Sequence, residues 1–221
     1  MRLKDSGFEL LSNFIDPGIA ESILSEVESD LQKSKGGGIR NADKKFGSIA
    51  KLSSSDQMLS SASKYLDGCP KLVRSILFDK SPTNNWLVTW HQDKTVALSS
   101  KFEKLDWGPW SVKDDTHHVQ PPVAVLENMV TFRIHLDDST IENGCLKVIS
   151  ASHMSGVLSQ DQIYAYAATN VETLIVAPAL SALAMRPHIL HASSKASKPS
   201  RRRILHLEYS GHDLPEGINW A

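Results

Sequence analysis

The sequence predicts a mainly β fold with helices at its N-terminal end. Helical periodicity is confined to about the first 70 residues, and from about Leu72 onward short β-type runs alternate with turn residues. Many short strands at such spacing are typical of a sandwich or a barrel. No linker-like stretch separates the two parts. We therefore expect one domain over residues 1–221, with a helical support segment (1–70) and a β-barrel core (71–212).

The N-terminal part begins with a short strand and continues with two helices. FELLSNFI indicates the strand, Asp16 is a suitable helix N-cap, and Pro17 suits the first helical position. The first helix is predicted to end at Lys35 and the glycines that follow it. The second helix is predicted from about Asp56 to Leu66. Apolar residues recur at helical spacing along the first helix: Ile19, Ile23, Val27 and Leu31.

The β part consists of eight short runs. In chain order they are LVRSILF, NWLVTWHQD, VTFRIHL, CLKVIS, TLIVA, ALAM, HILHA and RRRILHLEY. Segment 99–122 interrupts this series and is long for a plain connection within a compact domain. Long segments of this kind usually carry a function, so we expect a lid or a binding loop here.

The composition is that of an ordinary globular protein and excludes several partners. Hydrophobic residues make up 41% of the chain and charged residues 22%. The formal net charge is -1, which favours neither nucleic acid nor an anionic membrane as a partner. The two cysteines, Cys69 and Cys145, do not make a disulfide framework. With only two cysteines and no such framework, we expect a reducing, cytoplasmic setting. No apolar run has the length of a membrane span.

The segment Trp90-His91-Gln92-Asp93 gives the first indication of chemistry. It lies in a predicted strand, where side chains two residues apart point to the same face. His91 and Asp93 therefore project into one space. An imidazole and a carboxylate are two thirds of the 2-His-1-carboxylate triad that holds non-haem Fe(II). By itself a His-x-Asp pair is common by chance and is usually a polar strand edge.

The late part of the chain supplies a third ligand and an anion-binding arginine. His191 lies near the end of a short apolar strand, and strands remote in sequence are neighbours in a jelly-roll barrel. Arg202 follows in the next strand, where a planar guanidinium suits the far carboxylate of a small diacid. Leu205 and Leu207 belong to the more apolar face of that strand, so alternation alone would place Arg202 outward. We follow the spacing, because both faces of a barrel strand can be covered.

Three stretches resemble the phytanoyl-CoA dioxygenase family of Fe(II)/2-oxoglutarate-dependent oxygenases. They are WHQD, RIHLDDSTIENGCLKVISASH and LHASSKASKPSRRR, and with the N-terminal helical part they cover most of the chain. In the last stretch the family places the distal iron histidine and, eleven residues later, the arginine that binds 2-oxoglutarate. Eleven residues after His191 is Arg202. The resemblance implies a double-stranded β-helix, the jelly-roll barrel that cupins also have.

The resemblance also implies the roles of particular residues. His91, Asp93 and His191 would hold Fe(II), and Arg202 with Ser193 would bind 2-oxoglutarate. Arg133 falls where some relatives carry a tryptophan near the cosubstrate, so it is a further candidate contact. The turn at 149–153 reads Ile-Ser-Ala-Ser-His in place of the commoner Ile-Pro-Gly-Ser-His, and its histidine is kept.

Candidate substrate residues follow from their positions. Asn85 and Thr89 share the face of His91 by the period of two. Trp107 and Trp110, in the expected lid, could form an apolar substrate wall or anchor the loop. His118, from the pair His117-His118, is another candidate, and a solvated loop position is its alternative.

Four other polar residues have simpler interpretations. Lys80 and Arg40 are basic candidates for a substrate carboxylate, although such residues are more often surface charges. His135 is predicted to be a satisfied core histidine. His153 is predicted to hold its turn in place.

Together these features predict an oxygenase that uses Fe(II), 2-oxoglutarate and O2. We expect it to hydroxylate an aliphatic C–H bond of a small molecule and to release succinate and CO2. Related halogenases replace the carboxylate ligand with a small residue, so Asp93 favours hydroxylation over halogenation. The alternatives are a cupin-like metal-binding protein or metalloenzyme that does not use 2-oxoglutarate, and a non-catalytic binding module on the same scaffold.

Overall fold

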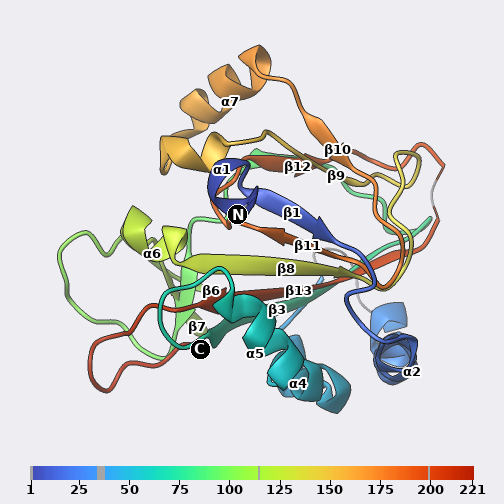
Figure 1. Cartoon of the computed structure of the whole chain (residues 1–221), viewed down its shortest axis with the longest axis horizontal. Helices are drawn as coiled ribbons and strands as arrows, with labels where there is room; N and C mark the ends of the chain where they lie inside the picture. Colours follow the sequence, from blue (N-terminus) through green and yellow to red (C-terminus); the bar gives the residue numbers. More distant parts are fainter. Residues whose placement is uncertain (1, 34–37, 114, 199) are drawn as a thin grey trace.

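The computed structural model describes residues 2–33, 38–113, 115–198 and 200–221, and its centre is a six-stranded antiparallel sheet (Figure 1). The strands, in spatial order, are β1 (Phe8–Leu11), β11 (Ala182–Met185), β8 (Met129–His135), β13 (Arg202–Ser210), β3 (Lys71–Lys80) and β2 (Ile39–Arg40). Neighbours in this order are distant in sequence. The sheet therefore brings residues from distant parts of the chain into contact.

A four-stranded antiparallel sheet faces the larger one. Its order is β10 (Thr173–Ile175), β9 (Leu146–Val148), β12 (His191–Ser193) and β4 (Val88–His91). Between the two sheets, Leu146 and Val148 pack with Leu183 and Met185 in a buried apolar cluster. The predicted mainly β fold with N-terminal helices is confirmed. Two facing antiparallel sheets are the jelly-roll arrangement, and over the described residues these sheets do not close into a barrel.

Strand β13 shows how alternation distributes side chains between the two faces of the large sheet. Leu205, Leu207 and Tyr209 point to the outer face and join the main apolar cluster under the helices. Arg202 and His206 point to the inner face, between the sheets. Both faces are covered, so the apolar outer face does not force Arg202 into solvent. Arg202 therefore points inward, as its distance of eleven residues from His191 predicts, and not outward, as alternation alone suggested.

The N-terminal helices cover the outer face of the six-stranded sheet. Helix α2 (Pro17–Lys33) packs there through Ile23, Val27 and Leu31, together with α4 (Gly47–Ser53) and α5 (Asp56–Ser63) (Figure 1). Asp16 caps α2 by accepting a hydrogen bond from Gly18 N at 2.8 Å. Both predicted helices are confirmed. The predicted end of the first, at Lys35, lies outside the described residues.

Other short elements complete the support. These are α1 (Arg2–Asp5), α3 (Ala42–Lys45), α6 (Val123–Glu127), the 3₁₀ helix η1 (Ser152–Ser155) and α7 (Gln160–Thr169). The sequence did not predict α7, although Ser159 and Gln162 form a capping box at its start. Ile163 of α7 packs with Leu190, directly before β12. None of the helices in the described ranges has the length and apolar character that crossing a bilayer requires.

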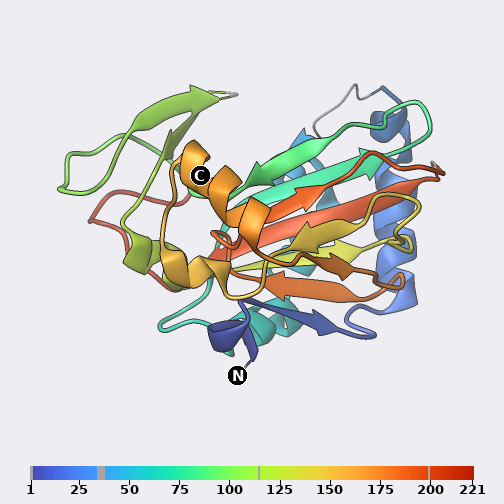
Figure 2. The same ribbon diagram turned by 90° about the horizontal axis from the view of Figure 1, so that it is seen from above.

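The segment predicted to be a long loop contains regular structure. Strands β6 (Trp110–Lys113) and β7 (Thr116–Val119) lie within 99–122, and β7 pairs with both β6 and β5 (Val96–Leu98) in a three-stranded sheet. Figure 2 shows this sheet at one end of the sandwich. Val96, Leu98 and Val119 are buried in its own apolar cluster. The expectation of an irregular loop is therefore wrong, because this segment is held by strand pairing. Its role as a lid stays a prediction.

Candidate active site

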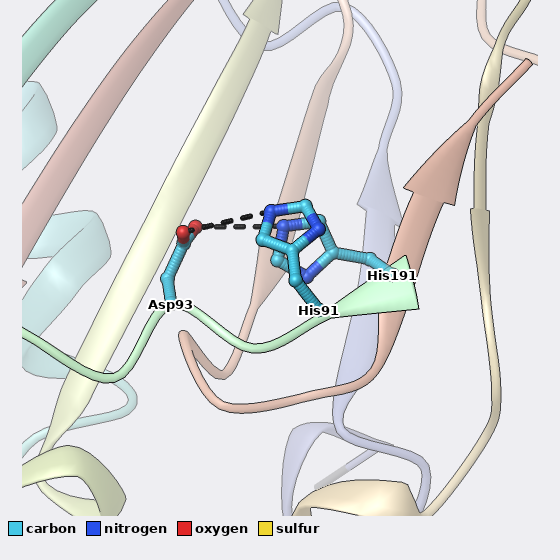
Figure 3. A group of neighbouring side chains, drawn as sticks. All are labelled: His91, Asp93 and His191. Atoms are coloured by element: carbon cyan, nitrogen blue, oxygen red, sulfur yellow. Dashed lines mark ion pairs between the residues drawn. The ribbon is translucent and has the colours of Figure 1, made fainter. Parts of the chain in front are cut away.

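The three predicted metal ligands meet at the junction of β4 and β12. His91 is the last residue of β4 and His191 the first of β12, and the two are paired directly in the antiparallel register. Their rings lie side by side, with centroids 4.1 Å apart. Asp93 follows just beyond the end of β4, and its main-chain N–H donates to the carbonyl of Pro187 at 3.0 Å. Asp93 therefore turns back toward both imidazoles (Figure 3).

The donor atoms of these residues face one another. Oδ1 of Asp93 lies 3.8 Å from Nε2 of His91, and Oδ2 lies 3.5 Å from Nε2 of His191 (Figure 3). All three ligand atoms lie within 4.8 Å of one another. Two imidazole nitrogens and one carboxylate on a single side are the donor set of a facial triad, which leaves positions open for further ligands.

Main-chain carbonyls fix the orientation of both imidazoles. Nδ1 of His91 lies 2.8 Å from the carbonyl of Thr89, and Nδ1 of His191 lies 2.9 Å from that of Ile189. A carbonyl only accepts, so each Nδ1 carries the proton and donates it. Each Nε2 then keeps its lone pair for a metal, as in many metal-binding histidines.

The protonation states also suit a divalent cation. Burial, followed by the neighbouring charge of His191, lowers the pKa of His91 to about 4. Burial tends to raise the pKa of Asp93, but the charge and hydrogen bond of His191 and the charge of His91 outweigh it. The pKa of Asp93 is therefore held well below its usual range. At neutral pH the site offers a neutral His91 and an ionised Asp93, which are the metal-binding forms.

Gln92 holds the segment between the two ligands in place. Its side chain points away from the donor atoms and is 6% exposed. The amide nitrogen donates to the carbonyls of Gly156 at 2.8 Å and His188 at 2.7 Å. The amide oxygen accepts from Leu158 N at 2.8 Å. These three bonds tie the metal-binding segment to the loops before α7 and before β12.

A cavity of about 160 Å³ opens between the sheets beside the triad. The inner faces of β3 and β13 form one wall, and β4, β9 and β12 form the other. Its lining residues are Arg74, Ile76, Phe78, Lys80, Trp86, Val88, His91, Asp93, Arg133, Leu146, His191, Ser193, Arg202, Ile204, His206 and Glu208. Besides the triad, the polar groups are mostly cationic, so the cavity suits an anion.

Arg202, Ser193 and Lys80 form a cationic group in this cavity. Arg202 is 5% exposed, and its terminal nitrogen Nη2 lies 3.5 Å from Oγ of Ser193. Its Nε has no hydrogen-bond partner among the described residues. Lys80 pairs with Arg202 in the strand register and donates to Ser193 Oγ at 3.1 Å. A buried guanidinium without a carboxylate partner leaves a place for the carboxylate of a ligand.

The two neighbouring arginines have different surroundings. Arg201 pairs with Glu28 at 2.7 Å and with Asp79 at 3.0 Å. Arg203 pairs with Asp137 at 2.7 Å. Both charges are neutralised on the outer side of the sheet. Of the three consecutive arginines, Arg202 is the one that lines the cavity, as the spacing from His191 predicts.

Arg133 also lines the cavity, within a buried chain of charged groups. It contacts Nδ1 of His206 at 3.1 Å, and Nε2 of His206 contacts Glu208 at 2.8 Å. Glu208 in turn pairs with Arg74 at 3.2 Å. Donor atoms of His206 and Glu208 also lie within 4.8 Å of an oxygen of Asp93. The donor atoms of His206 and Glu208 are already used in the contacts with each other, with Arg133 and with Arg74. In the triad, both Nε2 atoms instead face Asp93.

A β-bulge moves two predicted substrate residues away from the cavity. His191 pairs with His91 and Ser193 with Val88, so two steps along β12 match three along β4. The extra residue reverses the alternation, and Val88 and Trp86 face the cavity. Thr89 therefore does not share the face of His91. Asn85 instead binds the main chain of Ala196 through both ends of its amide, at 3.0 and 2.8 Å.

The predicted tryptophan wall also lies elsewhere. Trp107 and Trp110 pack around Phe102, with centroids 4.9 and 5.4 Å apart, beneath the three-stranded sheet. Neither of them lines the cavity at the triad. They anchor the segment, which is the alternative that the sequence left open. His118 is buried in β7 at 7% exposure and lines a second pocket next to Asp93.

The remaining histidines have different surroundings. Nε2 of His153 lies 3.1 Å from the carbonyl of Lys4, so His153 ties the turn after β9 to α1, as predicted. His135 is buried, but neither ring nitrogen has a partner among the described residues. The prediction that it is a satisfied core histidine is therefore wrong.

Sequence reasoning missed several residues of the site. It considered Lys80 only for a substrate, and it gave no role to Gln92, His206 or Glu208. A signal was present for the last two, because they share the alternating face of β13 with Arg202. The role of Gln92 rests on partners more than 60 residues away. No local pattern could have shown those partners.

Comparison with known proteins gives the same fold. The structure resembles HygX from Streptomyces hygroscopicus, solved with nickel and 2-oxoglutarate bound (TM-score 0.69, 13% identity, covering 97% of this chain and 86% of that one). It also resembles AviO1 from Streptomyces viridochromogenes Tue57 (TM-score 0.71, 18% identity, 97% and 94%). A third is SnoK, a non-heme alpha-ketoglutarate-dependent carbocyclase from nogalamycin biosynthesis (TM-score 0.74, 14% identity, 96% and 82%). At these identities the likeness shows the fold.

Sequence comparison gives the family. No curated protein sequence matches the chain. The family model described as Phytanoyl-CoA dioxygenase (PhyH) matches residues 3–204, which is nearly the whole chain. The chain belongs to the phytanoyl-CoA dioxygenase family.

Proposed function

We propose that this protein is an Fe(II)- and 2-oxoglutarate-dependent oxygenase that hydroxylates an aliphatic C–H bond of a small molecule. Iron, 2-oxoglutarate and O2 are the cofactors that its family and its structural neighbours support. One observation carries the proposal for this chain. The cavity that contains the donor atoms of His91, Asp93 and His191 also contains Arg202, a buried cation that has no carboxylate partner among the described residues.

Each group has a distinct task in this reaction. His91, Asp93 and His191 would hold the metal, while the Nδ1–H group of each histidine donates to a main-chain carbonyl. Arg202, Ser193 and Lys80 would bind the far carboxylate of 2-oxoglutarate and so orient its other end toward the metal. When bound, iron with 2-oxoglutarate and O2 supplies the oxidative decarboxylation to succinate and CO2, and the oxidant that attacks the substrate.

The volume and the charge of the cavity limit which ligand it can hold. The cavity beside the triad is about 160 Å³, below the roughly 300–1,000 Å³ of pockets for drug-sized ligands. It therefore suits a small diacid rather than a long acyl chain. Burial of Lys80, with the charges of Arg202 and Arg133, lowers the pKa of Lys80 to about 8. A bound carboxylate would restore the full preference of Lys80 for its charged form.

Asp93 bears on the outcome of the reaction. Its carboxylate faces Nε2 of both imidazoles and would be the third metal ligand, the one that related halogenases replace with a small residue. This arrangement supports hydroxylation over halide transfer. A solved neighbour of the same fold is a carbocyclase, and another, SnoN, is an epimerase, so product analysis belongs in the test.

The test is a comparison of Arg202→Met with Arg203→Met. In an anaerobic titration of the Fe(II) protein, 2-oxoglutarate should produce a weak visible charge-transfer band in the wild type. Loss of the Arg202 contact should weaken 2-oxoglutarate binding by roughly 10- to 100-fold, since a hydrogen bond to a charged group contributes about 1.5–3 kcal/mol. Arg203→Met removes the same side chain from the outer face and should leave the band unchanged.

Turnover completes the test. Succinate should form in the presence of Fe(II), 2-oxoglutarate and O2, and should disappear in His91→Ala but not in His117→Ala. Absence of the band in the wild type would support a cupin-like metalloprotein that does not use 2-oxoglutarate. Equal succinate formation by the wild type and His91→Ala would support a non-catalytic binding module.

A further inference from the structure

A second pocket adjoins the metal centre at Asp93. Its volume is about 350 Å³, and it shares four lining residues with the cavity described above, Arg74, Ile76, Phe78 and Asp93. A molecule in this pocket would therefore lie beside the metal ligands. The volume is at the lower end of the roughly 300–1,000 Å³ typical of small-molecule sites. The pocket thus suits a compact substrate.

The lining of this pocket is strongly basic. It includes Arg40 of β2, Arg74 of β3, Lys94 just after Asp93, and Lys113 of β6. Asp93 is the acidic residue among the lining side chains, and it serves as a metal ligand. Arg74 pairs with Glu208 at 3.2 Å, and Lys94 donates to the carbonyl of Leu158 at 3.3 Å. Glu208 offsets the charge of Arg74, whereas Lys94 and Lys113 have no carboxylate partner among the described residues. Against the single carboxylate of Asp93, these two lysines leave an excess of positive charge.

Two buried polar atoms at this pocket have no partner within the described part of the chain. They are Nδ1 of His118 and Nε of Arg74. His118 is 93% buried, being 7% exposed, so water does not readily replace a missing partner. Leaving such a group unsatisfied is unfavourable, and the usual explanation is a ligand or bound water. A ligand that reached Nδ1 of His118 would therefore gain a hydrogen bond that the described residues do not supply.

The charges of several lining cations lower the pKa of the buried imidazole of His118. Burial, followed by the charges of Arg74, Lys113 and Arg40, lowers the pKa of His118 to about 4. The imidazole is therefore neutral at neutral pH, and it can donate a hydrogen bond from one ring nitrogen. A neutral donor surrounded by cations suits an anionic oxygen and disfavours a cationic ligand.

We propose that this pocket binds an anionic group of the primary substrate, a carboxylate or a phosphate, and so places the substrate beside the metal. The inference rests on the proposed function, because it names the substrate class of the same site. Arg74 connects the two cavities, with one terminal nitrogen directed to Glu208 and the side chain lining both spaces. The anionic group would lie at the end formed by Lys113 and His118, and the rest of the substrate would extend toward Asp93.

Binding of matched probes tests this inference without requiring turnover. Phenyl phosphate, benzoate and benzyl alcohol share one ring and differ in charge. Each is titrated calorimetrically into the metal-free full chain and into the Ni(II) and 2-oxoglutarate-loaded chain. We expect at least one anionic probe to bind about 10-fold or more tightly than benzyl alcohol. The tighter of the two anions assigns phosphate or carboxylate, and equal affinities assign both.

Variants then locate the probe. Arg40 and Lys113 are exposed enough that the double variant Arg40→Gln/Lys113→Gln should fold, which its thermal melting curve would verify. This variant should weaken the anionic probe about 10-fold or more. Lys147→Gln, which removes a half-buried charge paired with Glu172 on the four-stranded sheet, should leave the affinity unchanged.

Two results would overturn the inference. One is equal binding, or no binding, of the charged and neutral probes. The other is a probe whose affinity falls in Arg202→Met but not in Arg40→Gln/Lys113→Gln, which would place it at the opposite end of the metal cavity. Both readouts work on the metal-free chain. Loss of anion binding at this pocket can therefore be told apart from loss of the Fe(II)- and 2-oxoglutarate-dependent activity.

Discussion

Replacing Gln92 by leucine should weaken both the fold and the metal centre. Leucine keeps the approximate volume of the side chain and removes the three hydrogen bonds to Gly156, His188 and Leu158. The change therefore isolates hydrogen bonding from the loss of packing. Gln92 does not contact the metal ligands through its side chain, so any effect on metal binding must come through the position of its main chain.

The expected loss of stability follows from those three bonds. A typical intramolecular hydrogen bond contributes about 0.5–1.5 kcal/mol, so the free energy of unfolding should fall by roughly 1.5–4.5 kcal/mol. For a chain of this size each kcal/mol lowers the melting temperature by roughly 2–4 °C. Two carbonyls and one N–H would remain buried without their partner, which places the loss in the upper part of this range.

The metal affinity should fall as well. Replacing a residue that holds metal ligands in position typically lowers the metal affinity by roughly 10- to 100-fold. Urea unfolding of the metal-free protein measures the first effect, and anaerobic titration with Co(II) measures the second. Gln160→Leu is the matched control, because Gln160 is exposed at the start of α7. Wild-type metal affinity in a destabilised Gln92→Leu protein would refute the positioning role.

Three further outcomes are expected. Burial lowers the pKa of His135 to about 3 and that of His188 to about 4, so between pH ~6.5 and ~4 the unfolded chain binds protons that the native chain does not. Stability of the metal-free protein should therefore be full above that window and decline as the pH falls through it, and a flat profile in urea unfolding would contradict this. Ala151 adopts a left-handed conformation with φ 62°, so Ala151→Gly should raise the free energy of unfolding by roughly 0.5–1 kcal/mol, and a loss of stability would show that the turn is not strained. Lys80→Met should weaken 2-oxoglutarate binding by roughly 10-fold or more in the anaerobic titration, whereas an unchanged affinity would restrict Lys80 to holding Ser193 and the carbonyl of Ser194.

The triad illustrates what a local pattern can predict. His91 and Asp93 are separated by one residue, so any extended segment brings them to one side, and the spacing from His191 to Arg202 singles out the arginine that faces the cavity. Strand alternation alone does not explain how the pair is placed. Asp93 lies beyond the end of β4 and is held by its bond to Pro187.

The substrate predictions show where a local pattern fails. Period two placed Asn85 and Thr89 beside His91, but the bulge opposite β12 reversed the face of the residues before it. A bulge is a property of two strands in register, and the second strand lies about a hundred residues downstream. For the same reason the sequence could not show that Trp107 and Trp110 pack on Phe102.

The sequence by itself determined the fold class, the donor residues and the family resemblance, because these depend on residue type and on spacing along one strand or between two motifs. Only the tertiary structure decided which side chains share a cavity. Arg40, Arg74, Lys113 and His118 come from four strands in two different sheets, and their charges act together only after those sheets have packed. The metal ligands can be predicted from a sequence motif, whereas the pocket beside them is formed by strands that are distant in sequence.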